Sequence, residues 1–185
     1  MTNVTFITGN ENKARLLSKL LGMEIEYHKL ALDEIQSPDP EAVVRHKVLQ
    51  AYDVLKRPVL VEDTCMGLDE LGGLPGPFIK FFIEQENGAE AICRMADGLS
   101  SRRATATITF GYYDGNRLDI ISNKVHGIIP DHPGKTVSGF GWDTVFVEDG
   151  YNGVVRSELD EATYEKLYRE AKPIDKVRDF LMKEA

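Results

Sequence analysis

The sequence predicts an α/β fold in which helices flank a mixed β-sheet. Over residues 4–65, short apolar strands alternate with amphipathic helices, as is typical of βαβ arrangements. Residues 103–113 alternate between apolar and polar side chains, which indicates a strand, and a hairpin turn follows at residues 114–116. Because the strands of a hairpin are antiparallel, we expect a sheet with parallel and antiparallel portions.

Composition limits the classes of function. The chain has 185 residues, 42% of them hydrophobic and 28% charged, so we expect a single globular domain over residues 1–185, of one or two lobes. A net charge of -8 argues against a nucleic-acid polymer as partner. Cys65 and Cys93 lack metal-ligand spacing, and there is no secretion-signal pattern or membrane-length apolar run. We therefore expect a cytoplasmic protein with reduced cysteines and no membrane contact.

The first strand, residues 4–7, ends at Thr8-Gly9-Asn10, and a helix follows with Asn10 as its predicted N-cap. Lys13 falls in the first turn of this helix, where a cation is unfavourable unless an anion lies nearby. Free backbone N–H groups, a glycine turn and a lysine are the components of a phosphate site. As a motif this combination is weak, so phosphate binding is one interpretation of it.

A second strand is predicted at residues 24–29, and the loop that follows carries Glu34, which by itself would be read as a solvated acid. Asp39 and Pro40 predict the start of a second helix, as its N-cap and first residue. Lys47 falls on or beside the buried stripe of that helix. Its ammonium either reaches bulk water or emerges into a binding cleft, and the two interpretations are comparable.

The stretch at residues 59–65 predicts a short buried strand that ends in two adjacent acids, Glu62 and Asp63. A glycine-rich loop at residues 71–77 follows. Acids at the carboxyl end of a central strand lie where open α/β sheets bind ligands. An acidic pair that only caps a turn is equally consistent with the pattern. Because neighbouring strand residues point to opposite faces, we expect the two acids to serve different roles.

Later segments predict further helices and strands. A helix at residues 78–86 is expected to bury the face formed by Phe78, Phe81 and Phe82, and a shorter helix to follow at 89–95. The remaining predicted elements are strands at 103–113, 118–122 and 125–129, a helix at 158–171, and a last helix from Pro173 to Met182. The cluster of Lys172, Lys176 and Arg178 is read by default as a solvated basic patch, and the four histidines as surface residues.

A glycine-aromatic loop at residues 139–143 ends in Trp142 and Asp143. Its rings could stack on a planar ligand, or they could fill the core of a hairpin. Together with a phosphate-binding helix start, several lysines and several acids, the first interpretation describes one kind of pocket. A nucleoside triphosphate with Mg²⁺ would use all four features, because lysines neutralise phosphate charge and carboxylates hold the metal.

These motifs resemble the inosine triphosphate pyrophosphatase family. The resemblance rests on Thr8-Gly9-Asn10 with Lys13, on Val61-Glu62-Asp63-Thr64 with the loop at 71–77, and on Phe140-Gly141-Trp142-Asp143 followed by residues 149–151. It implies an elongated mixed α/β fold with two lobes around a nucleotide-binding cleft, and a homodimer. It further implies cleavage of non-standard purine triphosphates (ITP, dITP, XTP) to monophosphate and pyrophosphate, dependent on Mg²⁺ or alternatively Mn²⁺.

The resemblance also assigns roles by position. Thr8, Asn10 and Lys13 would hold phosphates together with Lys47 and Lys80. Glu34, Glu62 and Asp63 would hold the metal and position water, with Asp63 as general base and with Glu62 and Lys13 in support. Phe140 would stack on the base, Trp142 and Asp143 would line its pocket, and Lys172 would contact the base or ribose side. Gly9, Thr64, Gly141 and Arg178 complete the implied substrate contacts.

One segment departs from the family pattern. A Ser-His-Arg triplet that reads the purine's oxo edge is expected after Lys172, but Lys176 and Val177 precede Arg178 here. Valine offers no hydrogen-bond donor, and losing a donor alters the selectivity of a site built on hydrogen bonds. Relaxed or altered base preference and a catalytically inactive nucleotide-binding regulator are therefore alternatives. The related Maf-type pyrophosphatases are a third alternative, which the Phe140–Asp143 loop disfavours.

Overall fold

The structure is a computed structural model that describes residues 3–136 and 141–182, and the chain divides into two compact units. Unit 1 comprises Met1–Asp63, Ile108–Asn123 and Lys172–Ala185. Unit 2 comprises Thr64–Thr107 and Lys124–Ala171. None of the helices in the described ranges has the length and apolar composition needed to cross a membrane.

The strands form a mixed sheet in the order β2-β1-β3-β5-β6-β7, with β4 paired to β3. β1 runs parallel to β2 and to β3, whereas β4 is antiparallel to β3 and β7 is antiparallel to β6. The predicted mixed α/β fold is therefore confirmed. The strands are β1 (Thr5–Ile7), β2 (Glu26–His28), β3 (Val59–Leu68), β4 (Pro75–Gly76), β5 (Arg103–Tyr113), β6 (Leu118–Ile128) and β7 (Val147–Glu148).

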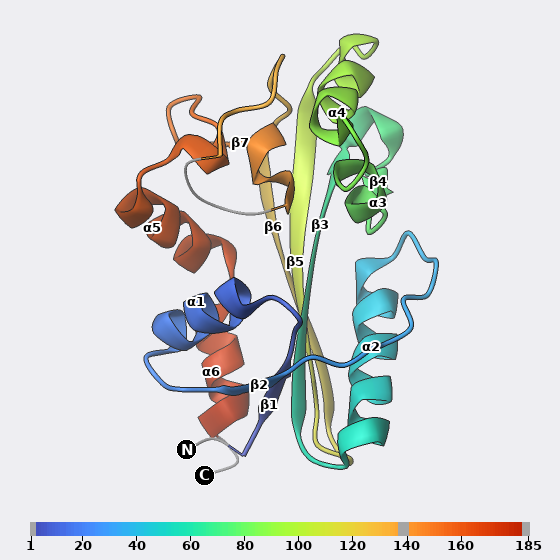
Figure 1. The fold of residues 1–185 in the computed structure, drawn as a ribbon, viewed down its shortest axis with the longest axis vertical. Coiled ribbons are helices and arrows are strands. Elements are labelled where there is room, and N and C mark those ends of the chain that lie inside the picture. The colour runs from blue at the N-terminus through green and yellow to red at the C-terminus, as the bar shows by residue number, and fades with distance from the viewer. Residues whose placement is uncertain (1–2, 137–140, 183–185) are drawn as a thin grey trace. The chain divides into compact units, whose positions relative to one another are not determined.

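Unit 1 has helices on both faces of its part of the sheet. α1 (Glu11–Leu21) and α6 (Ile174–Met182) lie on one face, and α2 (Pro40–Leu55) lies on the other (Figure 1). The predicted caps are confirmed: the Asn10 side chain accepts from the Lys13 N–H and Asp39 accepts from the Glu41 N–H. These caps set the first residues of α1 and α2, and so set the positions of Lys13 and Lys47 along the two helices.

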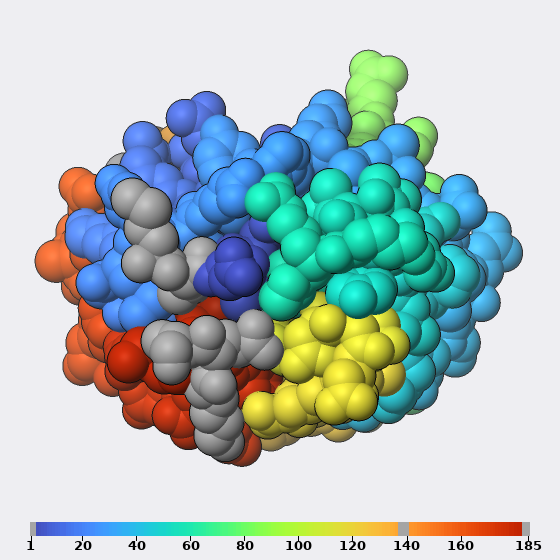
Figure 2. Space-filling model, turned by 90° about the horizontal axis from the view of Figure 1, so that it is seen from below, coloured from blue at the N-terminus to red at the C-terminus, as the bar shows by residue number. Residues whose placement is uncertain are grey.

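The core of unit 1 beneath α2 is aliphatic. Val44, Val48 and Ala51 have no exposed surface, and they pack with Val59 and Val61 of β3. At the far end of α2 the Tyr52 ring meets the edge of Tyr113, with ring centroids 4.8 Å apart. Figure 2 shows the yellow β5–β6 hairpin lying against this teal end of α2. The helix is therefore anchored against β3, the strand that carries Glu62 and Asp63, and against the β5–β6 hairpin.

Unit 2 has its own core, built from β3, β5 and the segments that cover them. Met66 and Leu68 pack there with Ile92 of α4 and with Phe146, and all four are completely buried. The helical segments of unit 2 are η1 (Asp69–Leu71), α3 (Ile79–Ile83), α4 (Gly88–Asp97), η2 (Gly141–Val145), η3 (Arg156–Glu158) and α5 (Glu161–Ala171).

Strand β3 is longer than predicted. It runs on to Leu68, so Glu62 and Asp63 lie inside the strand and not at its end. Two causes extend it: Met66 and Gly67 pair with Gly76 and Pro75 of β4, and Cys65 to Leu68 are buried. Because the acids sit in a regular strand, their side chains point to opposite faces, as expected.

The helix predicted at 78–86 is wrong in its extent and in its buried face. α3 spans only Ile79–Ile83, and Phe81 and Phe82 are 56% and 37% exposed. A five-residue helix turns little more than once, so it presents one narrow strip to the core, and Ile79 occupies that strip. β6 is one continuous strand where two were predicted. The helix predicted at 158–171 begins later, at Glu161, because the short helical segment η3 occupies Arg156–Glu158.

The close contact between Gly67 of β3 and Gly73 of the glycine-rich loop can be tested by substitution. A Cβ at Gly67 would overlap the carbonyl oxygen of Gly73, which the backbone bond from Gly73 N–H to Leu68 O holds in place. We expect Gly67→Ala to lower the free energy of unfolding by about 3 kcal/mol in urea denaturation. Gly98→Ala is the matched control because a Cβ there meets nothing within 4 Å. Equal effects of the two substitutions would contradict this packing.

Candidate active site

The turn between β1 and α1 is held by its own side chains. Thr8 Oγ1 accepts from the Asn10 N–H at 3.1 Å, and Asn10 Oδ1 accepts from the Lys13 N–H at 3.2 Å. Capping therefore directs the turn into the helix and places Lys13 in the first turn of α1. The ammonium of Lys13 lies 3.6 Å from Glu62 Oε1 of β3. Glu62 is therefore an anion that offsets the unfavourable position of a cation at the start of a helix.

Glu62 has no exposed side-chain surface and pairs with two lysines. Lys172 Nζ donates to Glu62 Oε2 at 2.6 Å, and the side chain of Lys172 is 1% exposed. Burial by itself would raise the pKa of Glu62, but the charges of Lys172 and Lys13 outweigh it and lower the pKa below its ordinary value. Glu62 is thus held as a carboxylate inside unit 1.

The default interpretation of Lys172 as part of a solvated patch is wrong. Lys172 lies between α5 and α6, and its ammonium sits 5.6 Å from the centre of the Phe110 ring as well as on Glu62. The chain positions it there because α6 packs through Val177, Phe180 and Leu181, which are buried. A charge this deep requires a partner, and Glu62 provides it.

A second group of ion pairs surrounds Lys47 on α2. Its ammonium lies 2.7 Å from Glu34 Oε1 and 3.3 Å from Asp63 Oδ1. The Lys47 side chain is 13% exposed, against 41% for Glu34 and 24% for Asp63. Burial lowers the pKa of Lys47, but Asp63 and Glu34 raise it by more, so the net shift is upward. The interpretation in which the ammonium merely reaches bulk water is therefore not borne out.

The two groups of ion pairs use opposite faces of β3. Glu62 pairs toward α1 and Asp63 pairs toward α2, and these helices cover opposite sides of the sheet in unit 1 (Figure 1). The structure thus brings the predicted residues of unit 1 together as two groups: Lys13, Glu62 and Lys172 in one, and Glu34, Lys47 and Asp63 in the other.

The fit of a metal ion can be judged from the carboxylates. Within residues 3–136 and 141–182, no three acidic, histidine or cysteine side chains converge as a metal cage. Glu34 and Asp63 nevertheless already share one cation, the ammonium of Lys47, and both retain solvent access. Mg²⁺ is usually held by one or two carboxylates together with water and phosphate oxygens. Glu34 and Asp63 fit that pattern, whereas the contacts of Glu62 are with lysines.

Unit 2 holds the residues expected at the base. Trp142 and Asp143 lie in η2 and are 8% and 1% exposed, while Phe140 lies outside the described residues. Gly141 has a φ of 64°, a conformation that favours glycine. Trp142 packs edge-on against Phe146 with ring centroids 5.6 Å apart, so this ring contributes to the core of unit 2.

The remaining predicted contacts are more exposed. Thr64 lies in β3 and Lys80 lies on the surface of α3, both in unit 2. Arg178 of α6 donates to Asp175 at 2.9 Å and to the Leu20 carbonyl at 3.5 Å, in unit 1. Val177 beside it is completely buried, so the residue at the family's histidine position serves packing.

Sequence reasoning missed Arg156 and the groups around it. Arg156 is 2% exposed and contacts the carboxylates of Asp143 and Glu148. Two signals were available. An arginine directly after two valines is unusual for a solvated loop, and Tyr164 and Tyr168 are spaced i, i+4 on one helix face, where both hydroxyls reach Asp143.

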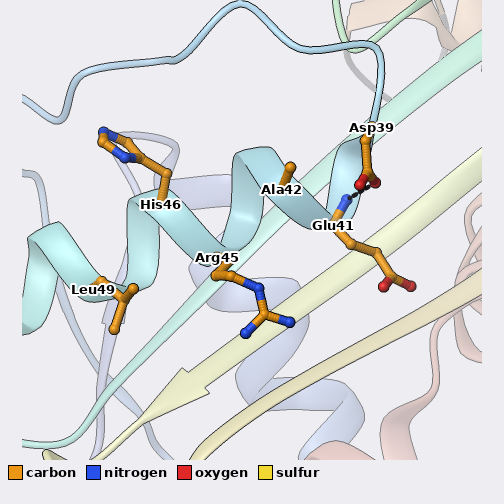
Figure 3. Close-up of a pocket in the computed structure, with 6 residues that line it drawn as sticks. All are labelled: Asp39, Glu41, Ala42, Arg45, His46 and Leu49. Atoms are coloured by element: carbon orange, nitrogen blue, oxygen red, sulfur yellow. Dashed lines mark hydrogen bonds between the residues drawn. The ribbon is translucent and has the colours of Figure 1, made fainter.

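A hollow with a volume of about 330 Å³ lies beside α2, but it is separate from these residues. Figure 3 shows its lining side chains along the helix, with Asp39 accepting from the Glu41 N–H at 2.9 Å. The lining residues are Asp39, Glu41, Ala42, Arg45, His46 and Leu49. No predicted site residue is among them, so the hollow is not the candidate site.

The buried pair of Lys172 and Glu62 yields a stability test. We expect Lys172→Met to lower the free energy of unfolding by about 3 kcal/mol or more near neutral pH, because Glu62 keeps its charge but loses its closest partner. Urea denaturation measures this. Lys166→Met is the control, since Lys166 is 70% exposed and its pair is worth less than about 1 kcal/mol.

The same pair predicts a pH dependence. A carboxyl with a lowered folded pKa contributes stability that is present above its unfolded pKa and is lost as the pH falls through the folded value. In Lys172→Met, burial should raise the pKa of Glu62, so acidification relieves the unpaired charge. The difference in the free energy of unfolding between parent and variant should therefore decrease as the pH is lowered from about 7 to about 4.5. A difference that stays constant over this range would contradict the pairing of Lys172 with a charged Glu62.

Comparisons with known proteins agree with this architecture. The inosine triphosphate pyrophosphatase 2 of Trypanosoma cruzi is 37% identical over 174 residues, covering 92% of this chain and 88% of that protein. The inosine triphosphate pyrophosphatase of Scheffersomyces stipitis is 34% identical, covering 98% and 99% of the two chains. A solved structure of a HAM1 protein from Coxiella burnetii has the same fold, with a TM-score of 0.82, 17% identity, and coverage of 99% and 100%. The model of the Ham1 family matches residues 4–180, and the chain belongs to that family.

Proposed function

We propose that this protein hydrolyses non-standard purine nucleoside triphosphates (ITP, dITP and XTP) to the monophosphate and pyrophosphate, and so removes them from the nucleotide pool. The observation that carries the proposal is the cluster of Glu34, Lys47 and Asp63, where two partly exposed acids share a single cation. Relatives named inosine triphosphate pyrophosphatases support the reaction, at 33–37% identity.

Charge balance supports a bound divalent cation. The three lysines and three carboxylates of the two ion-pair groups sum to zero. A triphosphate tail adds several negative charges, which this balanced set cannot neutralise. We propose that Glu34 and Asp63 hold Mg²⁺, or alternatively Mn²⁺, with Glu62 holding the lysines in place. The ion would supply charge neutralisation on the phosphate oxygens.

The lysines are proposed to hold the phosphates. Lys13 stands at the start of α1, next to the turn of Thr8, Gly9 and Asn10, and its ammonium is 3.6 Å from Glu62, a distance long enough for a further ligand to compete. Lys47, which pairs with Glu34 and Asp63 here, would turn to the phosphates if those acids held the metal. Lys80 and Thr64, in unit 2, are proposed as additional phosphate contacts.

Asp63 is proposed as the general base. It is 24% exposed, so water reaches it, and without a ligand its carboxylate pairs with Lys47. It would accept a proton from water as that water attacks the α-phosphorus in line with the departing pyrophosphate. Lys13 and Lys47 would stabilise the charge that develops on the leaving group. No covalent intermediate is needed.

By the family resemblance, Phe140, Gly141, Trp142, Asp143, Lys172 and Arg178 are proposed to recognise the base. Buried Val177 supplies no donor at the position where the family carries histidine. This observation favours a second candidate function, the same hydrolysis with a relaxed or altered base preference. A homodimer in the cytoplasm stays a prediction.

Asp63→Asn tests the proposed mechanism. We expect kcat for pyrophosphate release from ITP to fall about 1,000-fold, while nucleotide binding persists, because the amide cannot accept the proton. The control is Asp119→Asn, whose parent side chain is 27% exposed and paired with Arg117 outside the proposed site. Near-normal turnover in Asp63→Asn would contradict the role of Asp63.

A substrate panel tests the base preference. Pyrophosphate release should be measured for ITP, XTP, dITP, the four standard deoxynucleoside triphosphates and modified pyrimidine triphosphates, with Mg²⁺ and with chelator. We expect activity only with the metal, and a kcat/KM preference for ITP and XTP of about 10-fold or more. A flat profile would support relaxed specificity, and nucleotide binding without any release would support an inactive regulator.

A further inference from the structure

A buried polar cluster in unit 2 surrounds Arg156, which has no role in the function proposed above. Arg156 opens η3, and its guanidinium Nε lies 3.2 Å from Asp143 Oδ1 while Nη1 lies 3.4 Å from Glu148 Oε2. Apolar residues of similar volume often serve a core as well as a buried ion pair does. A buried arginine at this position therefore suggests a task beyond packing.

The same guanidinium is surrounded by aromatic rings. It lies 5.1 Å from the centre of the Trp142 ring, 5.0 Å from that of Tyr168 and 5.9 Å from that of Phe146. A planar, permanently charged guanidinium attracts ring faces within about 6 Å. Trp142 is also held edge-on by Phe146, at an interplanar angle of 89°. The orientation of the Trp142 ring is thus set from two sides.

Asp143 is fixed by the same cluster. Its Oδ1 faces Arg156, and its Oδ2 accepts from the Tyr164 hydroxyl at 2.7 Å and from the Tyr168 hydroxyl at 3.4 Å. Burial raises the pKa of Tyr164, so this hydroxyl stays protonated and continues to donate. Burial also raises the pKa of Glu148 to about 7, so near neutral pH the Glu148 carboxyl beside Arg156 is only partly charged.

We propose that Arg156 is a positioning residue that orients Trp142 and Asp143 toward the nucleobase and thereby sets the base preference of this protein. The inference rests on the proposed function, which assigns Trp142 and Asp143 to the base. It also offers a source of base discrimination in a chain where Lys176 and Val177 replace two of the three residues expected to read the base. Pre-organised contacts from Trp142 and Asp143 would then carry more of the discrimination.

Arg156→Lys tests the proposal, because lysine keeps the charge but loses the planar fork that spans Asp143 and the rings. The matched control is Arg103→Lys, also in unit 2. Arg103 forms a two-bond pair with Asp149 at 2.8 Å and 2.7 Å, but its side chain is 41% exposed. Both variants should first be checked for folding by circular dichroism and thermal unfolding.

Two readouts separate positioning from folding. Trp142 is the only tryptophan of the chain, so intrinsic fluorescence reports directly on its surroundings and on binding of IMP without metal. Steady-state kinetics give the ratio of kcat/KM for ITP over GTP. For Arg156→Lys we expect a shifted emission maximum, a KM for ITP raised about 10-fold with kcat within about 3-fold, and a smaller ITP/GTP ratio. Arg103→Lys should match the parent in all of these.

A folded Arg156→Lys variant with the parent's KM and ITP/GTP ratio would overturn the inference, as would a loss of kcat with unchanged KM for every nucleotide. Should this variant fail to fold, Tyr164→Phe decides, because it removes one donor to Asp143 and should lower the ITP/GTP ratio in the same direction. Failure of the proposed function looks different: the parent itself would then release no pyrophosphate from any triphosphate, whatever the variants do.

Discussion

Glu62 carries its negative charge with no access to solvent, and it depends on the ammonium groups of Lys172 and Lys13 to do so. Removing a carboxylate from water is costly, and only close pairing offsets that cost. These pairs join β3 to the first turn of α1 and to the residue that precedes the last helical segment. Glu62 and Lys172 are 110 residues apart in sequence. The packing of these segments in unit 1 therefore stabilises the charge of Glu62. Asp63 is the next residue along the same strand.

The alternation of the strand then separates two tasks. Glu62 turns toward Lys13 and Lys172 in the interior, while Asp63 turns toward Lys47 and retains access to solvent. A buried ion pair fixes the position of its side chains, whereas a partly exposed acid can exchange its partner for a proton or a metal ion. The ion pairs hold these side chains in place before any ligand arrives, and a triphosphate with its metal would exchange the partners of Lys47.

Unit 2 also contains a buried charge, the guanidinium of Arg156, which both carboxylates and aromatic rings surround. Arg156 is buried among Asp143, Glu148 and three rings, and the rings compensate for the loss of water on the faces of the guanidinium. Sequence reasoning identified Trp142 and Asp143 through their loop motif, but Arg156, Tyr164 and Tyr168 escaped it. These residues are 13 to 25 positions from Asp143 and belong to segments that look like an ordinary loop and a charged helix. Their convergence follows only from how η3 and α5 pack.

Local patterns in the sequence determined the mixed α/β class, the caps at Asn10 and Asp39, the bounds of β5 and the pointing of Glu62 and Asp63 to opposite faces, because each of these depends on neighbours within a few residues. The tertiary structure alone decided the full length of β3, the exposure of Phe81 and Phe82, the burial of Lys172 and the cluster around Arg156. Three of these depend on a partner elsewhere in the chain: β4 for the strand, Glu62 for Lys172 and Asp143 for Arg156. Pairing of buried charges is set by desolvation, and which charges are removed from water is known only once the chain has packed.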